Sequence, residues 1–470
     1  MRKDVLRIER RVRWLQADTE TPISLYIKAV GDRDGILLES AEVDGRWGRY
    51  SVLAYDMRFY IYCIDGALNL KIVDKRFGEL EKFNGMEFAE GLRALTRALD
   101  IVPGDDSLPH ITRALYGFLG FGMASVFNPV LRKVMPLSEA RCDLAFPGSI
   151  LVFDHLYNRL CQITLDEPKD FNASLPASEE TFFDADSAIS TPDESGYKEF
   201  VIKIREMLRE GEAIQVVPSV RFCAPFEGDP FYLYRRLRRF NASPYMFFMR
   251  FPEIALFGSS PEVMVKCSEN KLALSPIAGT RKRGADDDED NRLASELLND
   301  PKERAEHVML VDLGRNDLGR IAKKDSVRVD KLMRIEKFSH VMHITSRLTA
   351  NLEDGLDALD VLAATFPAGT VSGAPKIRAM EIIRSLEGAS RGPYAGCVGW
   401  IGLDKASVNL DMGITLRSMW VEDGRLCWQA GGGIVHDSDP EKEWKEVRDK
   451  SAIMRMAIQG KEKDYVPINR

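Results

Sequence analysis

The sequence predicts an α+β protein made mainly of large antiparallel β-sheets, packed as a sandwich with helices at the periphery. Short runs rich in β-branched and aromatic residues cluster in the first and last thirds of the 470-residue chain, whereas the helical patterns are few and stand apart. A regular alternation of strand and helix, which would predict a Rossmann or TIM fold, is absent. Apolar residues make up 45% of the chain and charged residues 29%, so the protein can bury a large core without structural disulfides or metals.

The N-terminal part predicts a meander of strands interrupted by a helix. Residues 51–66 alternate apolar and polar side chains and end in an Asp-Gly turn signal, and residues 68–74 continue as another strand. Apolar residues spaced by three and four predict a helix over residues 85–102. Residues 148–167 predict two strands around a turn at Tyr157–Asn158.

The rest of the chain repeats this mixture. Val201, Ile204 and Leu208 form the apolar face of a helix that ends near Gly211, and residues 214–222 predict the strand that follows. Further strands are expected at 244–251, 254–260, 261–267, 397–404, 407–423 and 425–435, and further helices at 301–313 and 373–386.

A change in composition divides the chain. Residues 168–196 are rich in Ser, Asp, Pro and Glu and lack a sustained hydrophobic period, which is typical of a linker. We therefore expect an N-terminal region at 1–167, this linker, a larger domain at 197–455 and a C-terminal tail at 456–470.

Composition also excludes several classes of function. The chain has 65 basic and 72 acidic residues and a net charge of −7, which argues against nucleic acid as a partner. No apolar run approaches the length that spans a bilayer, and the N-terminus is too charged for a signal peptide. The seven cysteines include no C-x-x-C pair, so we expect reduced, buried thiols in a cytoplasmic protein without a membrane partner.

Three motifs prove weak. Residues 369–376 begin with Gly and end with Lys but do not match the P-loop, and the glycines at 431–433 lack the third glycine of a dinucleotide fingerprint. Those glycines still let backbone N–H groups approach an anion. The acidic run at 285–291 does not fit the EF-hand template and predicts a solvated acidic loop.

Two pairs of glutamates are stronger candidates for a site. Glu303 and Glu306 lie three residues apart in one predicted helix, and Glu443 and Glu446 do so in another, so each pair shares one helix face. Alone, such a pair is usually a surface feature. If the two helices faced each other, the four carboxylates would repel one another unless a cation lay between them, and an oxygen-rich site of this kind suits Mg2+.

Four polar residues lie in apolar or glycine-rich surroundings: His343, Thr370, Tyr394 and Arg417. Any one of them is more often structural than functional. Arg417 lies in a strand-like run, where a half-buried guanidinium needs a carboxylate partner. A substrate carboxylate would serve that purpose.

Six segments occur in a fixed order between residues 197 and 450. They are IQVVPSVRF, SPIAGTRKRG, AEHVMLVDLGRNDLGR, FPAGTVSGAPK, YAGCVGWIG and AGGGIVHDSDPEKEWKE. Together they closely resemble the chorismate-utilising enzymes, and within them component I of the anthranilate synthases. The resemblance implies that residues 197–455 form a chorismate-binding catalytic domain, for a substrate that carries a ring carboxylate and an enolpyruvyl carboxylate.

The resemblance also implies which residues hold the ligands. Mg2+ would be held by Glu306 and Glu443, with Glu303 and Glu446 close by, and would bind the ring carboxylate. Tyr394 and Arg417 match positions that hold the enolpyruvyl carboxylate. The remaining implied substrate-binding residues are Thr370, Lys376, Gly431, Gly432 and Gly433.

The catalytic residues implied by the resemblance are His343, Glu262 and Thr370. His343 matches a residue near the leaving hydroxyl and the step that releases pyruvate, and Glu262 matches a general acid for that hydroxyl. In the family's reaction hydroxide leaves ring carbon 4 while a nucleophile adds at ring carbon 2. Because hydroxide is a poor leaving group, an acid must protonate it.

Two residues distinguish between members of the family. Relatives that form isochorismate or salicylate carry a Lys at the position of Gln215 to activate water, and Gln cannot do so. Aminodeoxychorismate synthases commonly carry a Lys in place of Ala278. Both residues favour direct addition of ammonia and hence anthranilate. Component I of aminodeoxychorismate synthase, which makes a 4-amino product for the folate pathway, remains the alternative.

Two further segments resemble the tryptophan feedback site of anthranilate synthases. They are residues 37–40 and 241–246, so the N-terminal region would contribute half of this site. Glu39 would take the amino group, and Ala242 replaces a proline that the family usually has. The implied inhibitor-binding residues are Leu38, Glu39, Ser40, Ser243, Pro244, Tyr245 and Met246.

No cysteine lies in the Gly-x-Cys-x-Gly turn that amidotransferases use to hydrolyse glutamine. The chain is therefore expected to take free ammonia, or to receive it from a separate glutamine amidotransferase subunit that the resemblance implies. A non-catalytic relative that binds tryptophan or chorismate is a rival hypothesis, which the intact set of candidate residues disfavours.

Overall fold

A computed structural model of the chain describes residues 5–40, 48–102, 104–105, 107–168, 170–171, 187–337 and 341–459. Among these residues twenty strands are linked by hydrogen bonds into one sheet, whose pairings are antiparallel. This confirms the predicted α+β class with large antiparallel sheets. The strands of this sheet are β2 (Arg11–Gln16), β3 (Gly35–Glu39), β4 (Tyr50–Ile64), β5 (Ala67–Ile72), β7 (Ala114–Leu119), β8 (Cys142–Asp154), β9 (Arg159–Thr164), β10 (Ile189–Thr191), β12 (Ser219–Pro225), β13 (Tyr245–Arg250), β14 (Ala255–Ser260), β15 (Val263–Ser268), β16 (Lys271–Leu274), β17 (Ile277–Lys282), β18 (Arg328–Lys337), β19 (Val341–Asn351), β21 (Cys397–Gly402), β22 (Leu410–Ile414), β23 (Ser418–Glu422) and β24 (Arg425–Gly431).

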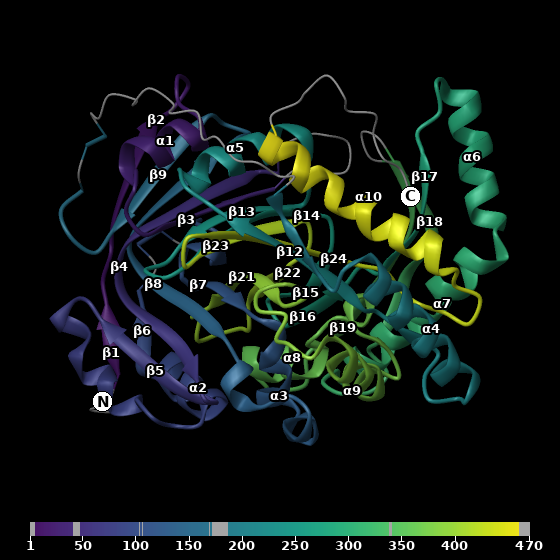
Figure 1. Cartoon of the computed structure of the whole chain (residues 1–470). Coiled ribbons are helices and arrows are strands. Elements are labelled where there is room, and N and C mark those ends of the chain that lie inside the picture. Colours follow the sequence, from purple (N-terminus) through teal and green to yellow (C-terminus); the bar gives the residue numbers. More distant parts are fainter. Residues whose placement is uncertain are drawn as a thin grey trace.

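The helices cover the outside of this sheet, and Figure 1 shows α10 lying across the strands with α5 at one end and α7 near the other. The helices are α1 (Pro22–Ala29), α2 (Phe88–Ala98), α3 (Ala124–Phe127), α4 (Glu194–Arg209), α5 (Pro230–Phe240), α6 (Asp287–Asn299), α7 (Pro301–Gly319), α8 (Ala358–Thr365), α9 (Lys376–Glu387) and α10 (Pro440–Gln459). Two short pairs lie outside the large sheet, β1 (Leu6–Ile8) with β6 (Leu99–Ile101) and β11 (Gln215–Val216) with β20 (Gly373–Ala374).

Strand β13 shows how the sheet buries both of its faces. Phe247 and Met249 point into a large core enclosed by the strands, whereas Met246 and Phe248 point into a second core under the helices. This is the two-residue period of a strand with apolar contacts on both sides. The central strands are thereby held rigidly, which is what a site built at their ends requires.

The N-terminal region and the larger domain share this sheet. Strand β3 pairs with β13, and β7 pairs with β21, so hydrogen bonds run between residues on either side of the predicted linker. Much of that linker, at 169 and 172–186, lies outside the described residues. Helix α10 continues to Gln459 with buried Ala457 and Ile458, so the expected tail at 456–470 begins as helix.

Most predicted elements are present, with three differences. The helix expected at 85–102 ends at Ala98, and the following residues form β6, because they pair with β1. The strand expected at 214–222 is broken between β11 and β12 at Pro218, which has no N–H for a ladder. The strand expected at 407–423 is likewise broken around Arg417. The predicted turn at Tyr157–Asn158 is confirmed, with Asn158 at φ 48°.

The acidic run at 285–291 is a helix start and not the loop that we expected. Asp286 caps α6 by accepting a hydrogen bond from the backbone N–H of Glu289 at 2.8 Å. Carboxylates in a first helical turn interact favourably with the helix dipole, which explains why so acidic a segment can be helical. Asp290 is buried and paired with Arg283, and this hydrogen-bonded ion pair lowers the pKa of Asp290.

The cysteines also differ from expectation, because Cys223 and Cys427 form a disulfide. They are direct partners in the register of β12 and β24, with Cα atoms 4.2 Å apart. The other five cysteines are reduced and buried, as we expected for all seven.

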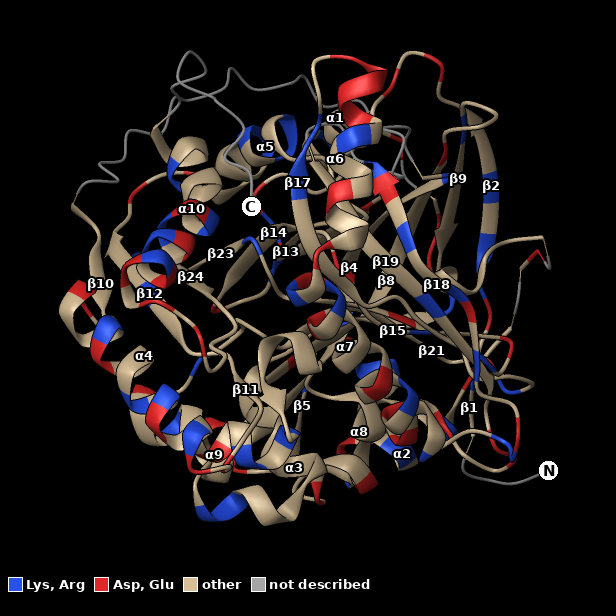
Figure 2. Cartoon of the chain, turned by 90° about the vertical axis from the view of Figure 1, so that its right-hand side faces the viewer, with Lys and Arg blue, Asp and Glu red and all other residues tan. Residues whose placement is uncertain are grey.

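Charged side chains of both signs are interspersed over the outer helices and over β18 (Figure 2). Among the described residues no helix is both long enough and apolar enough to cross a membrane.

Candidate functional site

One cavity of about 430 Å³ brings together most of the residues that the sequence singled out. It opens between the ends of β17, β19 and β24 and the helices α7 and α10. The predicted residues that line it are Glu262, Glu303, Glu306, His343, Thr370, Tyr394, Arg417, Gly431, Gly433, Glu443 and Glu446. Gln215 and Ala278, which distinguish members of the family, line the same cavity.

Helices α7 and α10 supply the four glutamates to this cavity. Glu303 and Glu446 each have a cation nearby, since Glu303 lies 3.6 Å from Arg281 and Glu446 lies 2.8 Å from Lys450. Glu306 has only a long contact of 3.9 Å to Lys302. Oε2 of Glu443 is buried without a hydrogen-bond partner. Glu306 and Glu443 are therefore the two carboxylates whose charge the protein leaves least compensated.

The electrostatics of this group reflect that imbalance. Burial, followed by repulsion from Glu303, Glu446 and Glu443, raises the pKa of Glu306 to about 6. Burial and the charge of Glu446 also raise the pKa of Glu443. Among the described residues no three acidic, His or Cys side chains are close enough together to form a ready-made metal site. The four carboxylates share a cavity but stand apart, as like charges do without a counterion.

Glu262 lies between β14 and β15 with 9% of its surface exposed. Its burial raises the pKa to about 7, although the positive charges of Lys450 and Arg417 act in the opposite direction. A carboxyl group with a pKa near neutrality still carries a proton in a large fraction of molecules at neutral pH and can donate it.

His343 projects from β19 and has the opposite property. Burial lowers the pKa of its imidazole to about 4, so the ring is neutral at neutral pH. Nδ1 lies 2.9 Å from the carbonyl oxygen of Gly279, to which it can only donate. The proton therefore resides on Nδ1, and Nε2 is the acceptor in this tautomer.

Arg417 occupies an unusual backbone position. It lies in the turn between β22 and β23 with φ 45°, and its carbonyl oxygen accepts a hydrogen bond from the backbone N–H of Ser259 at 3.1 Å. A left-handed conformation at a residue with a long side chain costs free energy and is typical of functional sites. The expectation of a strand at Arg417 was wrong, because the chain turns there and directs the residue to the cavity.

The glycines at 431–433, of which the first ends β24, allow a very close approach of neighbouring groups. A Cβ at Gly433 would lie 2.6 Å from Nε2 of Gln215, and a Cβ at Gly432 would lie 3.3 Å from Oε2 of Glu443. Gly432 itself is not among the residues that line the cavity. Side chains at these positions would fill the space between the sheet and the glutamates.

Lys450 and Arg281 line the cavity but were not predicted. Nζ of Lys450 donates to the carbonyl oxygen of Gly431 at 3.0 Å and pairs with Glu446 one helical turn away. A Glu–Lys pair four residues apart is common on helix surfaces, so its spacing carries no signal. Only the packing of α10 onto β24 shows that Lys450 faces a ligand-sized space.

Lys376, a substrate-binding residue implied by the resemblance, is not among the residues that line this cavity. It is the first residue of α9, and its Nζ lies 2.9 Å from Oδ2 of Asp317 on α7. The start of this helix directs the side chain towards α7, where Asp317 compensates its charge.

The two segments of the expected inhibitor site lie side by side, since Glu39 pairs with Met246 and Leu38 with Phe247 in the register of β3 and β13. Glu39 is already hydrogen-bonded within the protein. Its buried carboxylate accepts two hydrogen bonds from Arg238, at 2.8 and 2.9 Å, and one from the Tyr234 hydroxyl at 2.6 Å. An amino group bound by Glu39, as the resemblance implies, would share this carboxylate with Arg238 and Tyr234.

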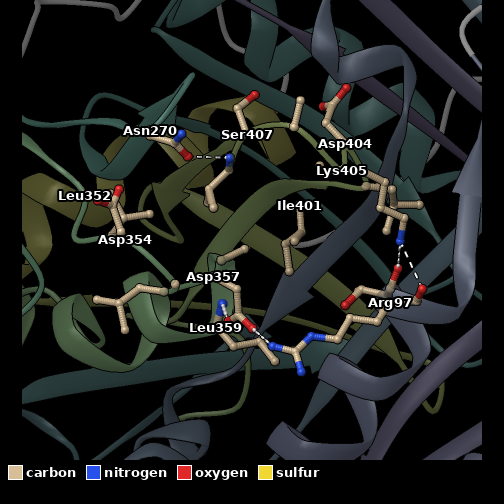
Figure 3. Close-up of a pocket in the computed structure, with 18 of the residues that line it drawn as sticks. Arg97, Asn270, Leu352, Asp354, Asp357, Leu359, Ile401, Asp404, Lys405 and Ser407 are labelled. Atoms are coloured by element: carbon tan, nitrogen blue, oxygen red, sulfur yellow. Dashed lines mark hydrogen bonds and ion pairs between the residues drawn. The ribbon is translucent and has the colours of Figure 1, made fainter.

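A second cavity of about 360 Å³ lies elsewhere, between α2, the start of α8 and the loop after β21 (Figure 3). Its charges are already paired within the protein. Lys405 donates to carbonyl oxygens at the end of α2, and Arg97 approaches Asp357 at 3.6 Å. The cavity with the glutamates is therefore the candidate active site.

Comparison with known proteins shows the family of the chain. Residues 58–456 match the model of the chorismate binding enzyme family. The chain is 40% identical, over 95% of its length and 93% of the relative, to "Anthranilate synthase component 1" of Aquifex aeolicus (strain VF5). It is 36% identical, over 94% of both chains, to the protein of the same name from Pseudomonas aeruginosa.

A solved structure gives the same result. The crystal structure of anthranilate synthase component I from Streptococcus pneumoniae TIGR4 superimposes with a TM-score of 0.72 at 32% identity, covering 94% of this chain and 99% of that one. The chain is thus an enzyme of the chorismate binding family and belongs, within it, to the anthranilate synthase component I proteins.

Proposed function

We propose that this enzyme converts chorismate and ammonia to anthranilate and pyruvate, as the first committed step of tryptophan biosynthesis. The observation that carries the proposal is that one cavity combines a buried carboxyl with a raised pKa, an imidazole with a lowered pKa, a guanidinium and two under-compensated carboxylates. Gln215 and Ala278 line the same cavity and offer no base for water and no amine nucleophile, which supports ammonia as the group that adds to the ring.

We propose the following roles for the residues. Ammonia adds at ring carbon 2 while Glu262 gives its proton to the hydroxyl at ring carbon 4, which leaves as water, and the ammonium group so formed returns one proton to the Glu262 carboxylate. The bond between the ring and the enolpyruvyl oxygen then breaks, the enolpyruvate takes a proton at its methylene carbon to become pyruvate, and the ring becomes aromatic by losing the proton at ring carbon 2. Nε2 of His343 is the acceptor placed to take it. Arg417 and the Tyr394 hydroxyl hold the enolpyruvyl carboxylate, which keeps the leaving group oriented.

We further propose Mg2+ as the cofactor, held by Glu306 and Glu443, with Glu303 and Glu446 outside them. The unpartnered Oε2 of Glu443 and the raised pKa of Glu306 support this position as one that a cation would stabilise. Carboxylates with room for water and substrate oxygens are the ligands that Mg2+ prefers. When bound, the ion would neutralise and orient the ring carboxylate of the substrate.

Feedback inhibition by tryptophan is a further part of this proposal. The pairing of β3 with β13 supports a site formed jointly by Leu38, Ser40 and the segment at 243–246. Because the Glu39 carboxylate is already hydrogen-bonded to Arg238, we propose that other acceptors bind the amino group of tryptophan. Glu39 would then fix the position of β3 against α5. The component I proteins it resembles also suggest a separate glutamine amidotransferase subunit as the source of ammonia.

One assay of product identity tests the central proposal. The purified chain, incubated with chorismate, Mg2+ and an ammonium salt at alkaline pH, should release pyruvate and blue-fluorescent anthranilate in equal amounts. A non-aromatic 4-amino product without pyruvate would assign the chain to aminodeoxychorismate synthesis. Binding of chorismate without any turnover would support a regulatory protein.

A further inference from the structure

A largely buried ion pair lies behind one wall of the candidate active site. Arg391, with 2% of its surface exposed, pairs with Glu387 at the end of α9. Two parallel hydrogen bonds join them, from Nε to Oε2 at 2.9 Å and from Nη2 to Oε1 at 2.6 Å. Burying a guanidinium and a carboxylate costs free energy that the pair recovers only when its hydrogen bonds are fully satisfied.

The other hydrogen bonds of Arg391 reach the backbone of the cavity wall. Nη1 donates to the carbonyl oxygen of Val371 at 2.9 Å, and Nη2 donates to that of Val217 at 2.6 Å. Both residues line the cavity, and Val371 follows Thr370 directly. The guanidinium also lies over the ring of Tyr394, 5.8 Å from its centroid, and over Phe121 at 4.6 Å.

Glu387 extends the same network to a further wall of the cavity. Its Oε1 accepts hydrogen bonds from the backbone N–H and the hydroxyl of Ser219, both at 2.8 Å. The Ser219 hydroxyl in turn accepts from Nε2 of Gln429 at 2.8 Å, and Gln429 lines the cavity beside Gly431. One ion pair thus connects four segments of the cavity wall. They are the residues just before β12, the residues around Thr370, the residues just before β21, and β24 itself.

We propose that Arg391 and Glu387 are positioning residues for chorismate, which hold the Thr370, Tyr394 and Gln429 walls of the cavity at the spacing that binds the substrate. The inference rests on the function proposed above. The inference concerns only the cavity walls that contain Thr370, Tyr394 and Gln429. The candidate metal ligands come from α7 and α10, and the described hydrogen bonds of the ion pair do not reach these two helices.

Arg391→Lys tests the proposal, because Lys keeps the charge but loses the planar fork that reaches Glu387 and two carbonyl oxygens together. We expect the KM for chorismate to rise on the order of tenfold, with a change in kcat of less than about threefold. The Mg2+ concentration that gives half the maximal rate should stay at the wild-type value. Ser219→Ala, a milder change, should raise the KM in the same direction by a smaller factor.

The matched control is Arg384→Lys on α9, the helix that carries Glu387. Arg384 also pairs with a glutamate, Glu139 at 2.6 Å, and donates to a carbonyl oxygen, that of Val134 at 3.1 Å, but it does not contact the cavity. Its replacement should leave the KM unchanged. Equal effects on KM from the two substitutions, or a loss of Mg2+ affinity in Arg391→Lys, would indicate general destabilisation and overturn the inference.

A double-mutant cycle gives an independent criterion. In a Tyr394→Phe background the rise in KM caused by Arg391→Lys should shrink, because part of what Arg391 positions has been removed. Multiplicative effects of the two substitutions would contradict the proposal. If wild type binds chorismate without releasing pyruvate, the proposed function fails, and the dissociation constants of the same variants, measured by calorimetry, still decide whether Arg391 positions the substrate.

Discussion

Replacement of Glu262 by Gln should stabilise the protein at alkaline pH and abolish its activity. Burial raises the pKa of Glu262 from an ordinary 4.5 to about 7 in the folded chain. Below pH 4.5 the group is protonated in both the folded and the unfolded states. Between pH 4.5 and pH 7 the unfolded chain loses the proton while the folded chain retains it, so the unfolding free energy falls as pH rises. Above pH 7 the group is ionised in both states, and its contribution no longer changes with pH.

The expected size follows from those two values. One unit of pKa corresponds to about 1.4 kcal/mol, so wild type loses about 3 kcal/mol of unfolding free energy through this group by pH 8. Gln does not ionise and avoids this loss. For a chain of 470 residues, 3 kcal/mol corresponds to a melting temperature about 3 °C higher.

Thermal unfolding of both proteins from pH 4.5 to pH 8 measures this effect. The melting temperature of Glu262→Gln relative to wild type should rise across that interval and stay constant above pH 7. Pyruvate release by the same variant should fall on the order of 100-fold or more, because an amide cannot protonate the leaving hydroxyl. A difference in melting temperature that does not depend on pH would refute the argument from burial, and an active variant would refute the role as acid.

Three further predictions concern the cavity and the proposed tryptophan-binding segment at 37–40. Glu306→Gln and Glu443→Gln should each lower kcat/KM on the order of 100-fold and raise the Mg2+ concentration needed for half the maximal rate. Glu441→Gln, on the exposed side of α10, is the control and should behave as wild type. Measurement of the rate at increasing Mg2+ concentration checks both expectations. Gly433→Ala should lower activity strongly, because its Cβ would lie 2.6 Å from the Gln215 amide, and Gln215→Ala in the same chain should restore part of the loss if that clash is the cause. Ser40→Phe should relieve inhibition by tryptophan without altering turnover, whereas Ser40→Ala should be inhibited nearly as wild type; inhibition curves for the two variants decide whether the β3 segment binds tryptophan.

Local spacing predicted which glutamates belong together, but not where they meet. Glu303 with Glu306 and Glu443 with Glu446 follow from the helical period. The approach of α7 to α10 depends on the packing of helices distant in sequence, which no local pattern encodes. Lys450 was missed for the same reason, since its ion pair with Glu446 has the spacing of a surface pair until α10 is placed against β24.

Other differences arise where one local rule overrides another. The strand pattern around Arg417 was interrupted by a left-handed residue, and that conformation has no signature in a non-glycine residue. The acidic run at 285–291 was predicted as a loop by its charge, yet the capping role of Asp286 and the helix dipole make it a helix start. The resemblance implies that Glu39 binds the amino group of tryptophan. The sequence does not reveal the ion pair of Glu39 with Arg238, because the two residues meet only through the packing of α5.

The most informative property of the site is that burial in one cavity shifts the pKa values of two groups in opposite directions. Removal from water disfavours the charged form of any group, so it raises the pKa of Glu262 to about 7 and lowers that of His343 to about 4. A group able to donate a proton and a group able to accept one can therefore coexist at neutral pH, without any need for the cavity to be acidic or basic overall. The proposed reaction requires one proton to be given to the leaving hydroxyl and one to be taken from ring carbon 2. Burial of the site is thus a direct cause of its chemistry, and a change that admits water should impair both proton transfers together.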